Sequence, residues 1–122
     1  MPFMLAQTLS ATLDLIFPPE CEICGKIPRS QASKGICEIC RLTIHPIPPP
    51  YCASCGRTAT SGALKCARCF HENFHFDRAY ACSFYQGNIK ELLHIYKFNG
   101  RKNLKYFFIE LMSEFCLRNL DI

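Results

Sequence analysis

The hydrophobic residues near the amino terminus repeat with a helical period. Apolar side chains recur every three or four residues, which predicts a helix over residues 4–17. These side chains are Met4, Leu5, Leu9, Leu13, Ile16 and Phe17. Pro18 and Pro19 end the helix, because proline lacks an amide hydrogen and clashes with a preceding turn. The polar face has no Lys or Arg to meet lipid headgroups, so we favour a helix packed on the protein over one lying on a membrane.

A second hydrophobic pattern begins at Phe76 and runs to the end of the chain. Arg78 to Tyr85 mixes aromatic and small residues and predicts a strand, which Gly87 interrupts. Asn88 is suited to cap a helix that Gly100 ends. One face of that helix carries Ile89, Leu92, Leu93 and Tyr96. The apolar stripe of a further helix consists of Leu104, Phe107, Phe108, Leu111, Met112, Phe115 and Cys116.

The segment between these patterns contains an internal repeat of Cys-x-x-Cys pairs. The first copy places its pairs at 21/24 and 37/40, and the second places them at 52/55 and 66/69. The pairs are separated by 12 residues in the first copy and by 10 in the second. The proline-rich residues 45–50 lie between the copies and predict an extended, stiff spacer.

The composition indicates a reducing compartment. The chain has 122 residues and ten cysteines, but no Lys or Arg in its first 20 residues and so no secretory n-region. It also lacks the apolar run of about 20 residues that a membrane span needs. We therefore expect a cytoplasmic protein without a membrane span, in which paired cysteines hold metal rather than form disulfides.

The four cysteine pairs predict two structural zinc sites. A Cys-x-x-Cys turn presents two sulfurs to one ion, and two such turns complete a closed tetrahedral site of the structural kind. Gly25 and Gly56 follow the first pair of each copy and let the backbone turn tightly. Sequential pairing is favoured over an interleaved cross-brace, because the repeat duplicates a whole unit. The predicted Zn²⁺ ligands are Cys21, Cys24, Cys37 and Cys40 in site one, and Cys52, Cys55, Cys66 and Cys69 in site two.

Other uses of these residues are weaker alternatives. The spacing differs from the usual ferredoxin patterns, and four pairs without a preceding strand do not match a thioredoxin-like redox motif. His71 and His75 follow Cys69 and could replace one of its site's ligands. Cys82 and Cys116 fall outside the repeat and are expected to be small buried hydrophobic residues.

Charge is unevenly distributed along the chain. The formal net charge is +4, and two Zn(Cys)₄ centres at about −2 each would bring the folded protein near neutrality. Local positive charge remains in the two carboxyl-terminal helices, interleaved with Phe98 and Tyr106. It is a candidate nucleic-acid or phosphate contact, although a solvated helix face is the simpler interpretation. The residues are Lys90, Lys97, Arg101, Lys102 and Lys105.

The order of these motifs resembles the front half of ComF-family proteins. An apolar helix ending in Phe17-Pro18-Pro19 precedes the cysteine repeat, and the segments 76–79, 85–89 and 97–100 follow it. The family comprises competence-associated, phosphoribosyltransferase-like proteins that begin with a double zinc ribbon. The resemblance implies a bacterial cytoplasmic protein linked to the handling of incoming single-stranded DNA.

The chain departs from that family in its catalytic half. No two acidic residues are adjacent, and the Thr- and Gly-rich turn of a diphosphate-binding loop is missing. We therefore assign no catalytic or organic-cofactor residues and expect no phosphoribosyl transfer by this chain alone. Three interpretations follow. The protein is a zinc-dependent module that binds single-stranded DNA or a DNA-uptake protein, or it is half of an enzyme completed by a second chain, or it is an inactive truncated product.

The predicted fold is α+β, with three parts. Residues 1–19 form the amino-terminal helix, and residues 20–75 form tandem zinc ribbons built on short β-hairpins. Residues 76–122 form a strand-helix-helix segment that corresponds, by the resemblance, to the start of a truncated α/β phosphoribosyltransferase-like domain.

Overall fold

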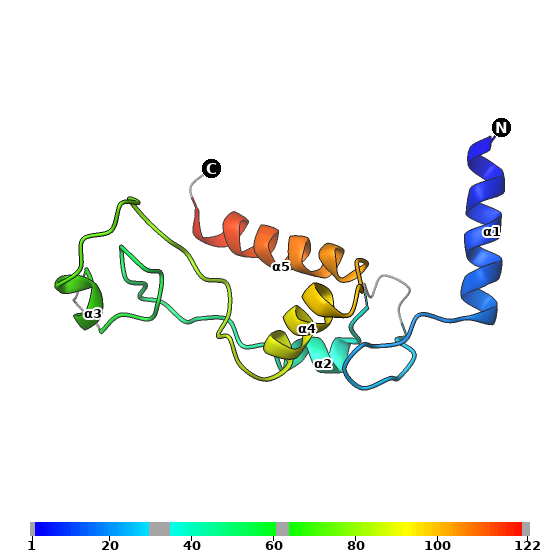
Figure 1. Cartoon of the computed structure of the whole chain (residues 1–122), viewed down its shortest axis with the longest axis horizontal. Coiled ribbons are helices and arrows are strands. Elements are labelled where there is room, and N and C mark those ends of the chain that lie inside the picture. Colours follow the sequence, from blue (N-terminus) through cyan, green and yellow to red (C-terminus); the bar gives the residue numbers. More distant parts are fainter. Residues whose placement is uncertain (1, 30–34, 61–63, 121–122) are drawn as a thin grey trace.

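The computed structural model describes residues 2–29, 35–60 and 64–120, and the side chains of residues 2–7 and 10 are not described. Helices connected by irregular segments make up this part of the chain (Figure 1). The helices are α1 (Pro2–Ile16), α2 (Glu38–Leu42), α3 (Ala67–Phe70), α4 (Gly87–Phe98) and α5 (Leu104–Asn119).

The amino-terminal helix forms as predicted, but its packing differs from the prediction. The amide of Phe17 donates to the carbonyl of Leu13 at 2.7 Å, and the chain then leaves the helix at Pro18 and Pro19. The described side chains of α1 are exposed, and the helix stands apart from α4 and α5 (Figure 1). The prediction that this helix packs on the rest of the protein is therefore wrong for one copy of the chain. The stiff Pro18–Pro19 link directs the helix away from the body.

The two carboxyl-terminal helices also form, with one difference at the start of α4. Gly100 adopts a φ of 68° just beyond the carboxyl end of α4, which matches its predicted role as a helix stop. Asn88 lies inside α4 rather than capping it, and Gln86 occupies the cap position without a side-chain bond. The Asn88 amide instead donates to the Thr43 hydroxyl at 2.7 Å, which ties α4 to the first cysteine repeat.

The principal core joins the first cysteine repeat to α4 and α5. Leu92, Leu104 and Phe107 are fully buried, and they pack in one cluster with cysteines 21, 37 and 40. Ile36 and Ile89 complete the buried set. Figure 1 shows α2 beside α4, with α5 lying across them. The first ribbon and the two long helices therefore form one packed unit.

An arginine holds α2 against α5. The guanidinium of Arg41 contacts Glu110 at 3.2 Å and Glu114 at 2.9 Å, and it lies over the Phe107 ring at 5.6 Å from the centroid. The planar guanidinium matches two carboxylates and an aromatic face at once. This contact fixes the orientation of α5 relative to the first ribbon.

The predicted strand at 78–85 and the predicted ribbon hairpins are wrong for the described residues. Isolated bridges occur there instead, at Tyr51–Thr58 and Pro46–Ser83. The segment that faces Ser83 belongs to the proline-rich spacer, whose prolines have no amide hydrogen to donate to a ladder. Single contacts hold the segment in place, such as the Ser83 hydroxyl donating to the His45 carbonyl at 2.9 Å.

Hydrogen bonds from the second ribbon hold the proline-rich spacer in place. Thr58 donates through its hydroxyl to the Pro48 carbonyl at 3.2 Å, and the Ala59 amide donates to the Pro50 carbonyl at 2.8 Å. The Pro49–Pro50 peptide bond is cis. Ile47 is buried within the spacer. Among the described helices, none has the length and apolar character required to cross a bilayer.

Candidate metal centres

The four cysteines of the first repeat converge on one point. The sulfurs of Cys21, Cys24, Cys37 and Cys40 all lie within 4.8 Å of one another. The Cys24 and Cys37 sulfurs are 3.6 Å apart. A tetrahedron with Zn–S bonds of about 2.3 Å has edges of roughly 3.8 Å, so this spacing matches a Zn(Cys)₄ centre. The donor set and its geometry fit a structural zinc ion.

The second repeat builds the same arrangement from its own cysteines. Cys52, Cys55, Cys66 and Cys69 also have sulfurs within 4.8 Å of one another, and the Cys55–Cys66 distance is 3.7 Å. Each cluster takes both pairs from a single repeat. The prediction of sequential pairing is confirmed, and the interleaved alternative does not apply.

Backbone hydrogen bonds shape the first pair of each ribbon. The amide of Cys21 donates to the carbonyl of Lys26 at 2.9 Å, while the amide of Gly25 donates back to Cys21 at 2.8 Å. Gly25 has a φ of 69°, a conformation that L-residues rarely adopt. Cys52 and Gly56 form the corresponding turn in the second ribbon, where φ of Gly56 is 73°. The glycine after each pair therefore permits this tight Cys-x-x-Cys-Gly turn, called the knuckle below.

The second pair of each ribbon begins a short helix. Cys37 precedes α2 and Cys66 precedes α3, both with extended backbone. The Cys40 amide lies 3.4 Å from the Cys37 sulfur, and the Cys66 amide lies 3.2 Å from the Cys52 sulfur. Amide hydrogens directed at sulfur stabilise the thiolate form that binds metal.

The electrostatics of the first site favour a bound cation. Burial by itself raises the pKa of Cys21, but amides of Cys24, Cys37 and Ile23 outweigh it and lower the pKa to about 6. Burial and the neighbouring thiols instead raise the pKa of Cys40 well above its ordinary value. Several thiolates cannot share so small a volume without a compensating positive charge, which a divalent ion supplies.

The second site shows the same contrast between a cysteine with a lowered pKa and one with a raised pKa. Burial acts to raise the pKa of Cys52, but the amides of Cys55, Cys66 and Ser54 lower it to about 6. For Cys69, burial and hydrogen bonds to the other thiols raise the pKa to about 12. The amide of Cys69 also lowers the pKa of Cys66. Each cluster thus includes at least one thiol that ionises readily and one that ionises only when metal replaces the protons.

The remaining cysteines and histidines lie outside the metal clusters. Cys82 and Cys116 are half-buried, and burial raises the pKa of the Cys82 thiol. These features agree with a packing role rather than with a reactive thiol. His71 is in edge contact with Phe70, at 5.3 Å between ring centroids, and neither His71 nor His75 joins the four cysteines of site two.

The structure places four of the five residues of the predicted basic cluster around one turn. Lys97, Arg101, Lys102 and Lys105 are exposed around the turn between α4 and α5, and Lys90 is exposed in the first turn of α4. Of these, Arg101 pairs with Glu22 of the first ribbon at 3.5 Å. The cluster therefore lies beside site one, a proximity that the sequence did not predict.

Aromatic rings accompany these cations. Lys105 lies over the Tyr106 ring at 4.9 Å, and Lys90 lies over the Tyr85 ring at 5.9 Å. Phe98 is 74% exposed and faces solvent next to Lys97. Exposed rings beside cations are a common means of contacting bases as well as phosphates.

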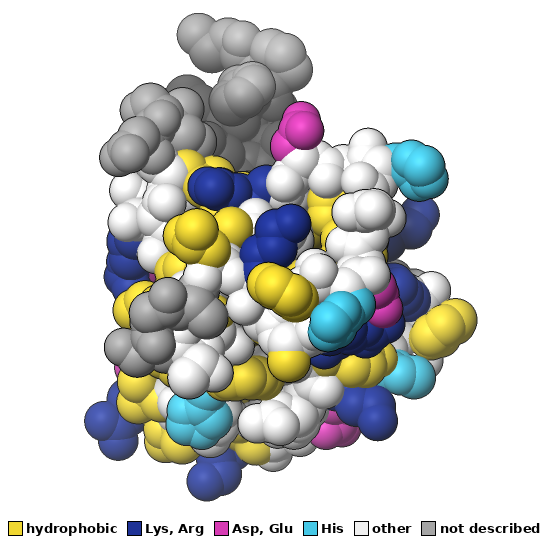
Figure 2. All heavy atoms as spheres, turned by 90° about the vertical axis from the view of Figure 1, so that its left-hand side faces the viewer, with side chains coloured by type: hydrophobic (Ala, Val, Ile, Leu, Met, Phe, Trp, Pro, Cys, Tyr) yellow, Lys and Arg dark blue, Asp and Glu magenta, His cyan; other side chains and the backbone are white. Residues whose placement is uncertain are grey.

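A further aromatic surface on the second ribbon was not predicted. Phe74 and Phe76 stack at 4.9 Å between centroids while remaining exposed, and Phe70 is also exposed. Figure 2 shows this end of the molecule, where hydrophobic and basic side chains lie among one another with few acidic ones. The aromatic density of residues 70–76 is the sequence signal that could have indicated this surface.

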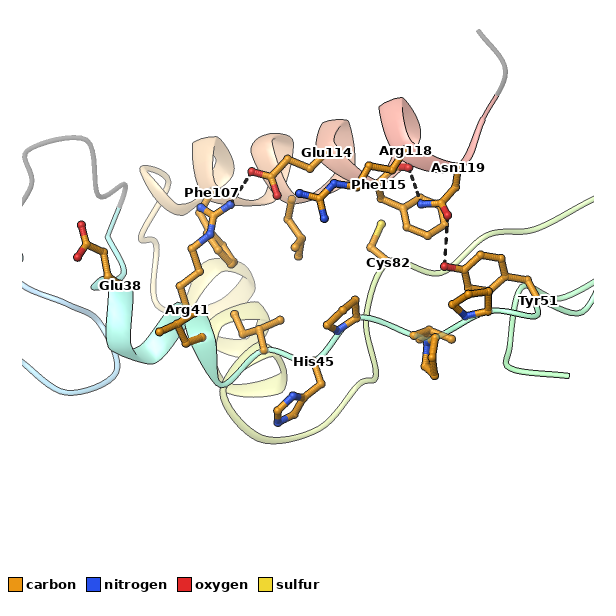
Figure 3. A pocket seen from close by; sticks show the side chains of 17 residues that line it. Glu38, Arg41, His45, Tyr51, Cys82, Phe107, Glu114, Phe115, Arg118 and Asn119 are labelled. Carbon is orange, nitrogen blue, oxygen red and sulfur yellow. Dashed lines mark hydrogen bonds and ion pairs between the residues drawn. The ribbon is translucent and has the colours of Figure 1, made fainter. Parts of the chain in front are cut away.

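An apolar groove was also absent from the sequence predictions. It has a volume of about 930 Å³ and lies between α2, the proline spacer and α5 (Figure 3). No sequence signal marks such a groove, because its walls are far apart along the chain. They include Ile44, Ile47, Cys82, Leu111 and Phe115.

Comparison with known proteins agrees with the metal centres. The family model of the double zinc ribbon domain matches residues 12–82, which include all eight clustered cysteines. Neither a curated protein nor a solved structure matches the chain.

Proposed function

The chain belongs to the double zinc ribbon family, and from that premise we propose that it is a zinc-stapled module whose basic helices contact nucleic acid. The two cysteine sites take all their ligands from protein side chains, so their role is structural rather than catalytic. Binding must then be carried out by surfaces outside the metal centres, and the basic cluster beside site one is the strongest candidate.

One observation carries this proposal. The buried cluster that contains Cys21, Cys37 and Cys40 also contains residues of α4 and α5, the helices that carry the basic side chains. A zinc ion in site one therefore holds the platform from which the five cations project. Structural zinc contributes roughly 10–16 kcal/mol in small zinc-binding modules, enough to fix such a platform.

The chemistry of the cluster suits single-stranded nucleic acid. Lysine and arginine side chains neutralise phosphates, and exposed rings such as Phe98 and Tyr106 provide faces for unpaired bases. The resemblance to ComF proteins supports incoming single-stranded DNA as the ligand, in the cytoplasm of a naturally competent bacterium. A DNA-uptake protein is the corresponding macromolecular partner in this proposal.

A second candidate function rests on a different observation. The outward side of α5 exposes Ile109, Met112 and Leu117. A second polypeptide that supplied the missing diphosphate-binding loop would cover this side and complete a transferase. By this proposal the chain is half of an enzyme and has no transferase activity alone.

Salt-dependent DNA binding tests the first proposal. The variant Lys97→Gln/Arg101→Gln/Lys102→Gln removes three charges from the α4–α5 turn without touching the core. With fluorescent oligo(dT) and fluorescence anisotropy, we expect weaker binding and a log K versus log[salt] slope reduced by roughly 2, at about 0.7 per phosphate contact.

A matched control removes equal charge from the second ribbon. The variant Arg57→Gln/Lys65→Gln/Arg68→Gln is also exposed and should keep the wild-type slope. Zinc content must be equal in all three proteins. Wild-type binding by the α4–α5 variant would remove the basic cluster from the proposal, and weaker binding by the control alone would move the site to the second ribbon.

A further inference from the structure

A stacked pair of phenylalanine rings is exposed on the second ribbon. The rings of Phe74 and Phe76 lie 4.9 Å apart between centroids with an interplanar angle of 19°, and the exposed fractions of the two residues are 38% and 49%. Phenylalanine rings usually contribute to stability by being buried, whereas this pair keeps aromatic surface in contact with solvent. A stacked pair with open surface is suited to receive a further flat group.

Metal site two fixes the loop that carries this pair. The loop follows Cys69 and α3, where the Phe70 amide donates to the Cys66 carbonyl at 3.1 Å. Beyond the pair, the Ala79 amide donates to the carbonyl of Ser54 at 2.8 Å, and Ser54 lies between two of the clustered cysteines. Both ends of the loop are therefore anchored to metal-binding turns, which preorganises the rings.

The surroundings of the pair do not favour an apolar protein segment as its partner. Such segments usually bind in a groove or add to the edge of a sheet. Residues 71–80, all of them described, form no strand. None of them lines the groove of about 930 Å³ or the smaller cavity of about 280 Å³ beside the start of α4. Flat rings exposed without a groove instead match the face of an unpaired nucleic-acid base.

The charges of the second ribbon indicate stacking rather than phosphate binding at this place. With a zinc centre at about −2, the charged side chains of the described residues 51–60 and 64–80 leave the ribbon close to neutral. Among them, Glu72 pairs with Arg68 at 3.6 Å. The basic residues are Arg57, Lys65, Arg68 and Arg78, and the acidic residues are Glu72 and Asp77. A base contact here therefore adds affinity with little dependence on salt.

We propose that an unpaired base of a nucleic acid stacks on the Phe74–Phe76 pair. This inference rests on the proposed function, because the phosphates of that nucleic acid are assigned to the basic cluster of α4 and α5. The second ribbon lies at the other end of α5 from the α4–α5 turn (Figure 1). Its position is fixed by the Tyr51 hydroxyl, which donates to Asn119 at 3.3 Å, and by the Tyr51 ring, whose centroid lies 6.1 Å from that of Phe115.

Fluorescence anisotropy with oligo(dT) over a salt series tests this base contact on the zinc-loaded full chain. Phe74→Leu/Phe76→Leu keeps apolar side chains but removes both rings. We expect its affinity to fall roughly fivefold to 100-fold, as for other rings that stack on one base, while the salt slope stays at the wild-type value. Phe74→Tyr/Phe76→Tyr keeps the aromatic faces and should bind like wild type.

Two controls sharpen the comparison. Leu64→Ala removes an apolar side chain that is 84% exposed elsewhere on the same ribbon, and it should bind like wild type. An abasic strand of the same length offers phosphates without bases, so the wild type and the leucine variant should bind it equally. Zinc content must be the same in all four proteins.

The affinity and the salt slope separate this inference from the proposed function. A leucine variant that binds oligo(dT) like wild type would overturn the base contact alone and would assign the exposed rings to a protein partner. Equal weakening in the tyrosine variant would also overturn it, because the ring faces would then not be what is recognised. A wild type that does not bind oligo(dT) would overturn the proposed function, and the base contact with it.

Discussion

At the scale of single residues, Gly25 and Gly56 hold equivalent positions in the two knuckles but have different surroundings. Both have positive φ, at 69° and 73°. A Cβ on Gly25 would meet nothing within 4 Å, whereas a Cβ on Gly56 would lie 2.7 Å from the Ala79 carbonyl oxygen and 2.8 Å from the Cα of Tyr80. The backbone at residues 79–80 therefore packs directly against the second knuckle at Gly56, and there is no such contact at Gly25 in the first knuckle.

This difference gives a prediction for alanine substitutions. Gly25→Ala should cost about 1–2 kcal/mol, the usual penalty for an L-residue in the left-handed region. Gly56→Ala should cost more, because the backbone at 79–80 must also move. Urea unfolding of both zinc-loaded proteins measures the difference. Equal destabilisation would show that the close approach of Ala79 to Gly56 contributes nothing to stability.

The sequence predicts which residues bind metal better than it predicts which distant residues contact one another. The eight zinc ligands follow from local spacing, because metal geometry fixes how two cysteines must lie in a chain. The contact of Arg41 with Glu110 joins residues 69 positions apart, and no local pattern encodes it. The same is true of the ion pair between Glu22 and Arg101, which brings the basic cluster to the first ribbon.

At the scale of elements, the three long helices α1, α4 and α5 were predicted from sequence, whereas the short helices α2 and α3 were missed and the predicted strands were wrong for the described residues. A helix satisfies its own backbone hydrogen bonds, so the apolar period of α4 and α5 is sufficient to identify them. A strand requires a neighbour that can pair, and the neighbour of residues 81–85 is the proline spacer. The predicted ribbon hairpins are likewise not found among the described residues of the two ribbons, where Tyr51 and Thr58 form an isolated bridge.

The elements also predict different consequences for losing each metal site. Site one shares its core with α4 and α5, whereas the core around site two consists of its own cysteines and Ala59. We therefore expect Cys24→Ser to reduce helicity at 222 nm substantially, and Cys55→Ser to leave α4 and α5 folded. Each variant should lose one of the two zinc equivalents, measured by elemental analysis.

Cys82→Ser is the matched control for these substitutions, because Cys82 is half-buried but belongs to neither cluster. It should retain both zinc ions and the wild-type circular dichroism spectrum. Equal loss of helicity in Cys24→Ser and Cys55→Ser would contradict the asymmetric coupling and would indicate that the two ribbons fold as one cooperative unit.

At the scale of the whole molecule, two buried clusters of very different size contribute to stability. The first joins zinc site one to the long helices, and the second has only small side chains around its cysteines. Small modules of this second kind are commonly unfolded without their metal. Zinc loss from the second ribbon should therefore precede the loss of the first.

Acidification tests this order. Amide hydrogen bonds lower the pKa of Cys21 and Cys52 to about 6, below the ordinary value of 9.0. A thiolate with a lowered pKa stabilises the fold fully above pH 9, and that stabilisation disappears as the pH falls through the folded-state value. Bound zinc competes with protons and moves the loss to still lower pH. We therefore expect both ions to be retained at pH 7 and released below about pH 6.

The two releases should be separable. Measured by elemental analysis after desalting at each pH, the first zinc equivalent should leave from site two with little change in helicity. The second should leave from site one together with the circular dichroism signal of α4 and α5, because these helices share its core. Cys55→Ser should show the second step alone. A single step that removes both ions and the helicity together would mean that the spacer couples the ribbons as tightly as either core does.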